Sequence, residues 1–383
     1  MHWDQVETAM GDAVASGSIV GATAAVWSET GNFIGAVGES VAGHPLRIDA
    51  MFDLASMTKA VTSVAMMQLV ERGALGLDDP AGDYVPYLRD VEVLDGFGDD
   101  GSPIRRTPTR PVTVRHLATH TAGFGYEFSS DLTARFISSA PRPVPGSQAR
   151  YEYPLMFDPG DHWLYGVSTD WLGRVVEVVS GQQLEAYLRE HVLGLLQMDD
   201  TTFFPTPGQV ERMAIPHVRT EAGLRPDPVR IPAPDVEMVS GGGGLFGTVG
   251  DYLRFVRMLL GRGSVDGVQI LAPDSVDQMC ADQFGSPDGG AGHGFGPAVR
   301  SDLETFTEED VGWGLSFSIH RSGRPKRRSA GSLSWMGALN TFYWIDPSKR
   351  IVGVYATQVE PLLDPPVLNA FSRFERAVYD TLG

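Results

Sequence analysis

Cysteine and long apolar runs are what this sequence most conspicuously lacks. The single cysteine, Cys280, excludes an intramolecular disulfide framework. No run of about 18 apolar residues is present, which excludes a membrane-spanning helix. The N-terminal residues also lack a basic region followed by an apolar core, so we expect no signal peptide. These absences predict a cytoplasmic protein that makes no contact with a membrane.

Basic residues are also few compared with acidic residues. The formal net charge is −18, which repels nucleic acid and anionic lipid surfaces, and we expect neither as a partner. Of the 30 basic residues only three are lysines, Lys59, Lys326 and Lys349. Lys59 is unusual among them because its sequence neighbours, such as Val61 and Val64, are apolar. Burying a charged amine among apolar residues costs free energy, so this position of Lys59 indicates a chemical role.

The order of the predicted elements indicates an α+β fold. Strand-like runs occur at residues 21–28 and 33–37, and again at 313–320, 332–345 and 350–358. Helical spacing is found at both ends of the chain and through its middle. We therefore predict one central antiparallel sheet built from both termini and flanked by helices, formed by residues 1–89 and 300–383. Residues 90–299 are predicted to be a mostly helical inserted region with long loops.

Ser56 and Lys59 form the first chemical motif. They lie three residues apart at the start of an apolar helical run that extends to residue 72, so both face one side of a helical turn. A hydroxyl and an amine at this spacing are a nucleophile and a base within reach of each other. A position at the start of a helix also turns the Ser56 N–H toward a developing oxyanion.

Other stretches offer the remaining groups that acyl transfer needs. Tyr165 follows a Pro-Gly turn and precedes a helix, which is a suitable place to project a phenol toward a nucleophile. Trp335-Met336-Gly337-Ala338 lies on a predicted strand, where the glycine permits close approach and the next N–H is a second candidate oxyanion donor. The glycines at 241–244 lack a following Gly-Lys-Ser/Thr, so close backbone approach at a turn is the preferred interpretation over phosphate binding.

Taken in order, these stretches resemble the serine β-lactamase and penicillin-binding protein superfamily, and most closely the family VIII carboxylesterases, which are similar to class C β-lactamases. The resemblance covers nearly the whole chain. It is carried by residues 53–59 (Asp-Leu-Ala-Ser-Met-Thr-Lys), 115–126 (Arg-His-Leu-Ala-Thr-His-Thr-Ala-Gly-Phe-Gly-Tyr), 159–165 (Pro-Gly-Asp-His-Trp-Leu-Tyr), 242–246 (Gly-Gly-Gly-Leu-Phe) and 335–337 (Trp-Met-Gly).

The resemblance implies a role for each matching residue. Ser56 is the nucleophile, Lys59 and Tyr165 share the proton transfers, and the backbone N–H groups of Ser56 and Ala338 hold the oxyanion. Which of Lys59 and Tyr165 is the base in each step stays open. Tyr126, Trp335 and Gly337 are expected to contact the substrate. No cofactor and no metal are implied.

Two departures from the β-lactamase pattern favour esters over lactams. The Tyr-x-Asn motif has Val167 at its third position, which removes an amide, and the Lys-Thr-Gly motif is replaced by Trp335-Met336-Gly337, which removes a cation. The expected substrate is therefore a small-molecule, short-chain carboxylic ester. The resemblance also allows weak β-lactam hydrolysis. A β-lactamase, an amide or D-peptide hydrolase and an acyltransferase of the same fold stay as alternatives.

Readings outside this superfamily are less favoured. No Gly-x-Ser-x-Gly is present, which disfavours an α/β-hydrolase, and His116 and His120 are more typical of structural residues at a helix end. No His-Glu-x-x-His occurs, which disfavours a metal hydrolase. A non-catalytic ligand-binding module has no need of Ser56, Lys59 and Tyr165 together.

Overall fold

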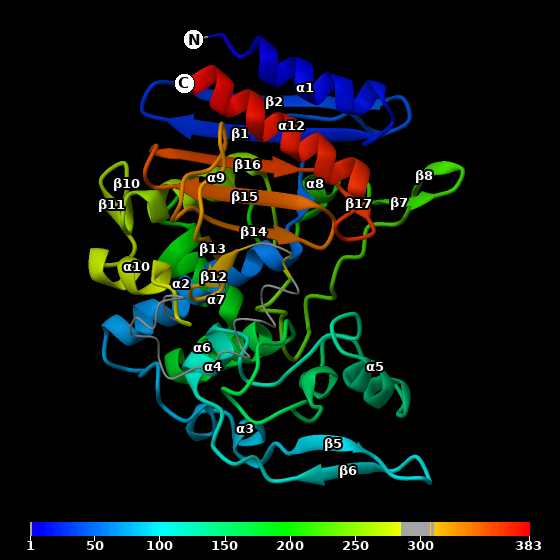
Figure 1. Cartoon of the computed structure of the whole chain (residues 1–383), viewed down its shortest axis with the longest axis vertical. Coiled ribbons are helices and arrows are strands. Elements are labelled where there is room, and N and C mark those ends of the chain that lie inside the picture. The colour runs from blue at the N-terminus through cyan, green and yellow to red at the C-terminus, as the bar shows by residue number, and fades with distance from the viewer. Residues whose placement is uncertain (1, 285–306, 308–309) are drawn as a thin grey trace.

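The computed structural model describes residues 2–284, 307 and 310–383, and it is organised around one antiparallel sheet (Figure 1). The sheet has eight strands in the order β12-β13-β14-β15-β16-β1-β2-β3. The strands, in sheet order, are Val311–Trp313, Ser318–His320, Leu333–Gly337, Thr341–Asp346, Ile351–Ala356, Gly21–Ser28, Asn32–Val41 and His44–Pro45. Two neighbouring strands inside the sheet, β1 and β16, come from opposite ends of the chain, with Ala25 opposite Val354. The predicted α+β fold is confirmed.

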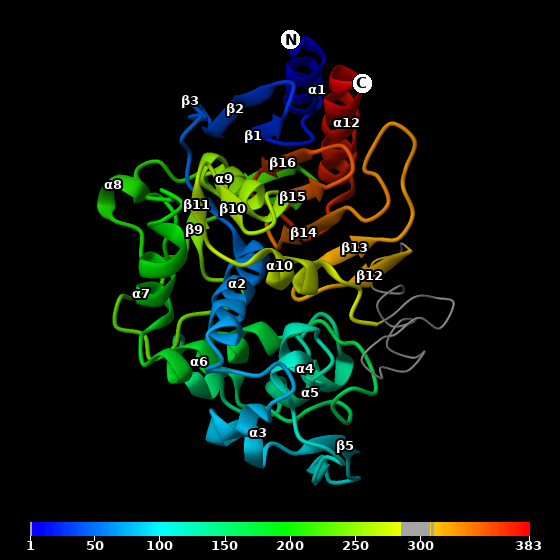
Figure 2. The ribbon, with the colours of Figure 1, turned by 90° about the vertical axis from the view of Figure 1, so that its left-hand side faces the viewer.

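One face of the sheet is covered by the first and last helices of the described chain, α1 (Asp4–Ala15) and α12 (Pro365–Leu382), which lie side by side (Figures 1 and 2). Their apolar stripes enclose a core that includes Val6, Met10 and Phe374. The predicted start of the last helix is confirmed, because the Val367 N–H donates to the Asp364 side chain at 3.1 Å.

The other face carries α2 (Thr58–Glu71) and α9 (Val249–Leu260). Helix α2 is buried on nearly every side, since all residues from Thr58 to Leu69 are buried. It runs from the sheet toward the helical region, and it packs there on α6 (Ser168–Ser180) (Figure 2). A helix apolar all round belongs inside a protein, and this one joins the two parts of the molecule.

The remaining elements lie between residue 44 and residue 280, or close to the C-terminal helix. The short helices there are α3, α4, α5, α7, α8 and α10, with bounds Pro86–Asp90, Val114–Ala118, Asp131–Ser138, Leu184–Leu188, Pro207–Val210 and Pro273–Cys280. A π-helical turn, Arg189–Leu193, continues α7. The minor strands β4 to β11 and β17 are Phe52–Asp53, Val93–Phe97, Pro103–Arg106, His217–Thr220, Gly223–Pro226, Phe246–Gly247, Ser264–Val265, Val268–Gln269 and Val359–Glu360.

The predicted division into a sheet domain and an inserted region stays a prediction. The sheet strands do come from residues 21–45 and 311–356, but α9, which belongs to the range 90–299, packs on β1, β15 and β16. The proposed boundary at residues 299 and 300 lies outside the described residues. Within the described ranges, none of the helices is both long and apolar enough to cross a membrane.

Two predicted strands are wrong in one respect, because each is a hairpin. The range 313–320 contains the end of β12, a turn and β13, and the turn includes Ser316 at φ 75°. The range 332–345 contains β14, a turn and most of β15, and the turn includes Asn340 at φ 59°. Both turns are rich in apolar residues, so they resemble strand in the sequence.

Candidate active site

The turn that precedes α2 presents the predicted nucleophile. Ala55–Met57 form a single 3₁₀ turn, and α2 begins at Thr58, so Ser56 lies at the helix entrance and is partly exposed. Lys59 lies one turn further on and is 0% exposed. Its Nζ donates to the Ser56 Oγ at 3.1 Å. The structure therefore joins the two residues that the sequence motif paired.

Lys59 has two further hydrogen-bond acceptors, and neither is charged. Its Nζ donates to the Gly242 carbonyl at 2.7 Å and to the Tyr126 phenol at 3.2 Å. Within the described part of the chain it forms no ion pair with a carboxylate. A buried lysine normally has a carboxylate as a hydrogen-bond partner, and Lys59 has three neutral acceptors instead.

The four glycines at 241–244 form the loop that supplies the carbonyl. Thr62 donates to the Gly241 carbonyl at 2.7 Å, and the Leu245 N–H donates to the Thr58 hydroxyl at 3.1 Å. A Cβ at Gly242 would lie 2.5 Å from an oxygen of Asp170, so the backbone approaches α2 and α6 too closely for any other residue. The expectation of close backbone approach is confirmed.

Asp170 anchors this loop from beneath, and the sequence analysis missed it. Its carboxylate is buried and accepts from the Ser240 hydroxyl at 2.6 Å and from the Gly242 N–H at 3.2 Å. Burial raises the pKa of Asp170, and the nearby positive charge of Lys59 opposes that rise. An acidic residue beside Trp171 and Leu172, at the start of an apolar helix, was the signal available in the sequence.

Tyr165 lies next to the amine in a dense aromatic setting. The Lys59 Nζ sits 4.7 Å from the centroid of its ring, and the residue is 3% exposed. The Trp335 indole N–H donates to the Tyr165 phenol oxygen at 3.1 Å. The Tyr126 N–H donates to the Tyr165 carbonyl at 3.2 Å, which fixes the two tyrosine segments side by side. Ser56, Lys59, Tyr165 and Tyr126 thus meet in one place.

Trp335, Gly337 and Ala338 bring β14 to the same place. Trp335 is 4% exposed and its indole N–H donates to the Tyr165 phenol, and substrate contacts of Trp335, Gly337 and Tyr126 stay predictions. A Cβ at Gly337 would lie 2.5 Å from the Leu54 carbonyl, which shows how closely β14 approaches the turn before Ser56. Ala338 follows this contact directly and is exposed. A second oxyanion donor at Ala338 stays a prediction.

The two nearby histidines have the structural character that was expected. The His116 Nδ1 accepts from the Thr113 N–H at 3.1 Å and completes a capping box at the start of α4. His120 is fully buried against the rings of Tyr165 and Trp313, at centroid distances of 4.9 and 5.6 Å. Burial lowers the pKa of both imidazoles, to about 4 for His116 and well below its usual value for His120.

The pieces of this arrangement fit one known architecture. Over the described residues, no group of three or more His, Cys, Asp or Glu side chains is placed to hold a metal ion. The model of the family named Beta-lactamase matches residues 5–377. The chain belongs to the β-lactamase family. Its members include serine hydrolases and acyltransferases, and a catalytic role for Ser56 and Lys59 stays a prediction.

Characterised relatives place the chain on the esterase and acyltransferase side of the β-lactamase family. It is 31% identical to lovastatin esterase of Penicillium rubens over 374 residues, 92% of each chain. It is 31% identical to monacolin J acid methylbutanoyltransferase of Aspergillus terreus over 363 residues, 88% of this chain and 83% of the relative. The solved LovD6 mutant of simvastatin synthase (LovD) from A. terreus superposes with a TM-score of 0.87 at 30% identity, covering 98% and 94% of the two chains.

Proposed function

We propose that this β-lactamase-family enzyme cleaves short-chain carboxylic esters through an acyl-enzyme on Ser56, as family VIII carboxylesterases do. The observation that carries the proposal is the contact of the Ser56 hydroxyl with a fully buried amine that has neutral acceptors. The phenol of Tyr165 lies beside that amine and is held by an indole, where β-lactamases have a cation. A neutral site of this kind suits a small neutral ester better than an anionic lactam.

The donors and acceptors around Lys59 explain how it can act as a base. The Gly242 carbonyl can only accept, so one N–H of the amine is committed to it. Burial raises the pKa of Tyr126 well above its usual value, so its phenol stays protonated. A neutral amine then donates its second N–H to Tyr126 and directs its lone pair at the Ser56 hydroxyl, which is the arrangement that proton abstraction needs.

Acylation follows from that arrangement. The Ser56 oxygen attacks the ester carbonyl as its proton passes to the Lys59 amine. The N–H groups of Ser56 and Ala338 stabilise the oxyanion, and the start of the helix adds its dipole. Tyr165 delivers a proton to the departing alkoxide, which leaves as the alcohol and leaves the acyl group on Ser56. Lys59 restores the proton that Tyr165 has lost.

Deacylation uses the same groups in reverse. Tyr165 and Lys59 remove a proton from water, which attacks the acyl-enzyme, and Ser56 is released with its proton returned. A hydroxyl of an acceptor alcohol can take the place of water. Acyl transfer is the second candidate function, because a relative at 31% identity is named a methylbutanoyltransferase and the solved structure at 30% identity is a simvastatin synthase.

The deciding experiment measures p-nitrophenyl butyrate hydrolysis by the wild type and Ser56→Ala, with mass spectrometry of the acylated protein. We expect a mass increase of one butyryl group on the peptide that contains Ser56. Ser56→Ala should reduce kcat by on the order of 10⁴-fold or more. A variant that keeps more than a few per cent of the activity, or an acyl group on another residue, would overturn the proposal.

The partition between esterase and transferase is measured in the same assay with added alcohol. A nucleophilic alcohol at increasing concentration should yield butyryl ester at the expense of butyrate if the acyl-enzyme accepts alcohols. Nitrocefin and a D-amino acid amide test the lactamase and amidase alternatives. A protein that is never labelled by a fluorophosphonate or by penicillin would instead be a binding module.

A further inference from the structure

Ala55, the residue before the nucleophile, has an unusual backbone conformation. Its φ is 43°, in the left-handed region that residues with a Cβ seldom adopt. Such a conformation is unfavourable and persists only where its surroundings enforce it. The peptide plane between Ala55 and Ser56 carries the Ser56 N–H. The conformation of Ala55 therefore sets the direction of the predicted oxyanion donor.

The side chain of Asp53 is bonded to the backbone of Ala55. The Ala55 N–H donates to its Oδ1 at 2.8 Å, which closes a short turn around Leu54. This hydrogen bond fixes the amide on the N-terminal side of Ala55, and so restricts rotation about φ. Over the described residues the Ala55 N–H makes no other hydrogen bond, so Asp53 is the specific partner of this residue.

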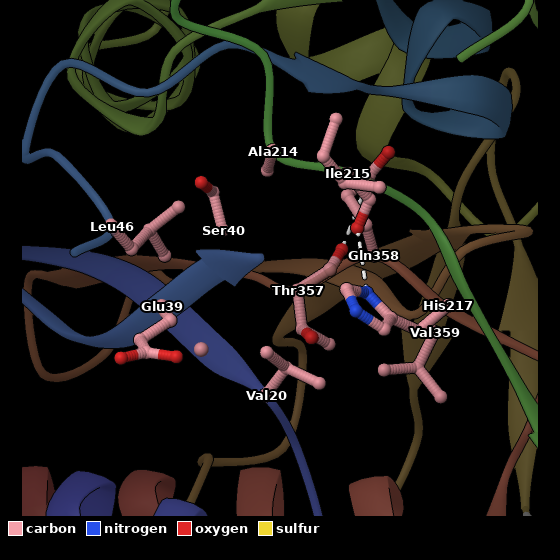
Figure 3. A pocket seen from close by; sticks show the side chains of 11 residues that line it. Val20, Glu39, Ser40, Leu46, Ala214, Ile215, His217, Thr357, Gln358 and Val359 are labelled. Carbon is pink, nitrogen blue, oxygen red and sulfur yellow. Dashed lines mark hydrogen bonds between the residues drawn. The ribbon is translucent and has the colours of Figure 1, made fainter. Parts of the chain in front are cut away.

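Asp53 is itself held by the far end of the chain. The Gln358 side-chain amide accepts from the Asp53 N–H at 3.2 Å and donates to the Asp53 carbonyl at 3.1 Å, as a neighbouring strand would. Gln358 borders a small cavity with Thr357 and His217, shown in Figure 3, and the residues lining that cavity do not include Ser56, Lys59 or Tyr165. The Leu54 N–H also donates to the Leu245 carbonyl at 3.0 Å. Both sides of the turn are thus fixed.

We infer that Asp53 is a positioning residue, which holds Ala55 in its left-handed conformation and thereby aims the Ser56 N–H at the oxyanion. This inference rests on the proposed acyl-enzyme chemistry of Ser56. Asp53 does not touch the reacting atoms. Its effect is expected in kcat and in the rate of modification of Ser56, with little change in KM.

The charge of Asp53 is secondary to its geometry. Burial raises the pKa of its carboxyl to about 6, and the like charge of Glu360 adds to that rise. Asparagine at this position still presents an oxygen to the Ala55 N–H without a titrating group. The pair Asp53→Asn and Asp53→Ala therefore separates the hydrogen bond from the charge.

The test combines changes at residues 53 and 55, because glycine adopts positive φ without strain. Asp53→Ala should lower kcat for p-nitrophenyl butyrate about 10- to 100-fold, below the loss for removing an oxyanion donor outright. Asp53→Asn should stay within about fivefold of wild type. Ala55→Gly alone should be close to wild type, and Ala55→Gly added to Asp53→Ala should recover at least about half of the lost activity on a logarithmic scale.

Two further readouts separate positioning from general damage. The rate at which a p-nitrophenyl phosphonate labels Ser56 should fall and recover in parallel with kcat, whether or not butyrate esters are good substrates. Thermal unfolding shows whether each variant is folded. If Asp53→Ala does not fold, Asp53→Glu, whose carboxylate is displaced by one methylene, should show a loss that Ala55→Gly also rescues. A folded Asp53→Ala with wild-type labelling, or a loss that Ala55→Gly leaves unchanged, overturns the inference.

Discussion

Each face of the central sheet carries a buried charged side chain, and the two side chains differ in their partners. On the face covered by α1 and α12, Glu375 is 2% exposed and is bonded to the Arg328 guanidinium, with Arg327 4.0 Å away. On the face covered by α2 and α9, Lys59 is fully buried and its amine contacts a hydroxyl, a phenol and a carbonyl. The first charge is bonded directly to an opposite charge, whereas the hydrogen-bond acceptors of the second are neutral and the nearby carboxylate of Asp170 is not bonded to it.

This difference distinguishes a buried charge that is held in an ion pair from a buried charge whose hydrogen-bond partners are neutral. A matched ion pair keeps its ionisation state because removing either partner leaves the other uncompensated. Around Lys59, the Gly242 carbonyl can only accept a hydrogen bond, whereas the Ser56 hydroxyl and the Tyr126 phenol can each donate or accept one. The sequence places an acid in one helix and a lysine in another, and the proposed catalytic role falls to the second.

The largest expected effect comes from removing the amine. Lys59→Met keeps the length and apolar character of the side chain, and kcat/KM should fall by on the order of 10⁴-fold while the protein stays folded. Glu375→Gln is the matched change on the other face. It should lower the free energy of unfolding by about 3 kcal/mol, since Arg328 loses its counter-charge, and leave kcat unchanged. Ester turnover gives kcat/KM and thermal unfolding gives the stability of both variants. An active Lys59→Met variant would contradict the proposed role of Lys59 as the base.

Tyr165→Phe should come next. Loss of the phenol that donates to the leaving alkoxide should reduce kcat by about 10²-fold or more. The control is Tyr355→Phe, on the α1 and α12 face, because the Tyr355 hydroxyl is buried without a hydrogen-bond partner among the described residues. That control should leave kcat and stability nearly unchanged. Equal kcat values for the two variants would make Tyr165 a packing residue.

Glycine substitution sharpens the contrast at the backbone. Gly242→Ala places a Cβ 2.5 Å from an Asp170 oxygen, so the loop must shift away from Lys59. We expect a loss of stability of about 1–3 kcal/mol together with reduced kcat. Gly11→Ala, in α1, meets no atom within 4 Å and should stabilise the protein by about 0.5–1 kcal/mol. Denaturant titration of both variants measures their free energies of unfolding. A Gly242→Ala variant as stable as the wild type would argue against a rigid loop.

A smaller effect is expected from the second phenol. Tyr126→Phe removes the acceptor of one Lys59 N–H but leaves the contacts to Ser56 and Gly242. The cost of one neutral hydrogen bond, about 0.5–1.5 kcal/mol, predicts a loss in kcat/KM of about 2- to 10-fold. The pH–rate profile should shift as well, since the environment of the amine changes. A loss as large as that of Tyr165→Phe would give Tyr126 a direct part in proton transfer.

The last prediction concerns stability at low pH and leaves the catalytic step untouched. The pKa of His116 in the folded protein is about 4, below the value of about 6.5 in the unfolded chain, so the unfolded state binds the proton first. Its contribution is complete above pH 6.5 and is lost as the pH falls toward 4. His116→Gln keeps the capping box and should flatten the pH dependence by up to about 1 kcal/mol per pH unit. Unfolding titrations between pH 7 and pH 4.5 test this, and an unchanged slope would contradict it.

Local signals in the sequence predicted the parts of this structure that depend on local spacing. The Ser56 and Lys59 pair, the capped start of α12 at Asp364 and the close approach at Gly242 all follow from one turn of chain or one residue type. The hairpin turn at Ser316 was missed because its neighbours Leu315 and Phe317 are apolar. The left-handed φ also falls on a serine, whereas a glycine at this position would have indicated a turn.

The missing parts of the candidate site are contacts between distant segments. Gln358 meets Asp53 across a separation of 305 residues, and Ser240 meets Asp170 across 70. No periodicity or spacing reports such pairs in a single sequence. The direct bond between Tyr126 and Lys59 was missed for the same reason, although both residues were named. The residues of the candidate site named in the sequence analysis could be predicted from their motifs. Their contacts with distant segments could not, because those contacts depend on the tertiary fold.

The pairing of β1 with β16 has a consequence for biosynthesis. Strand β1 can pair with β2 early, but it pairs with β16 only when residues 351–356 have left the ribosome, and the turn around Asp53 gains Gln358 later still. A nascent chain therefore carries a hairpin of β1 and β2 whose other edge, on β1, stays unpaired for most of translation, and such an exposed strand edge favours aggregation. Ser56 becomes competent late, so a polypeptide truncated before Ile351 should accumulate as an inactive and aggregation-prone fragment.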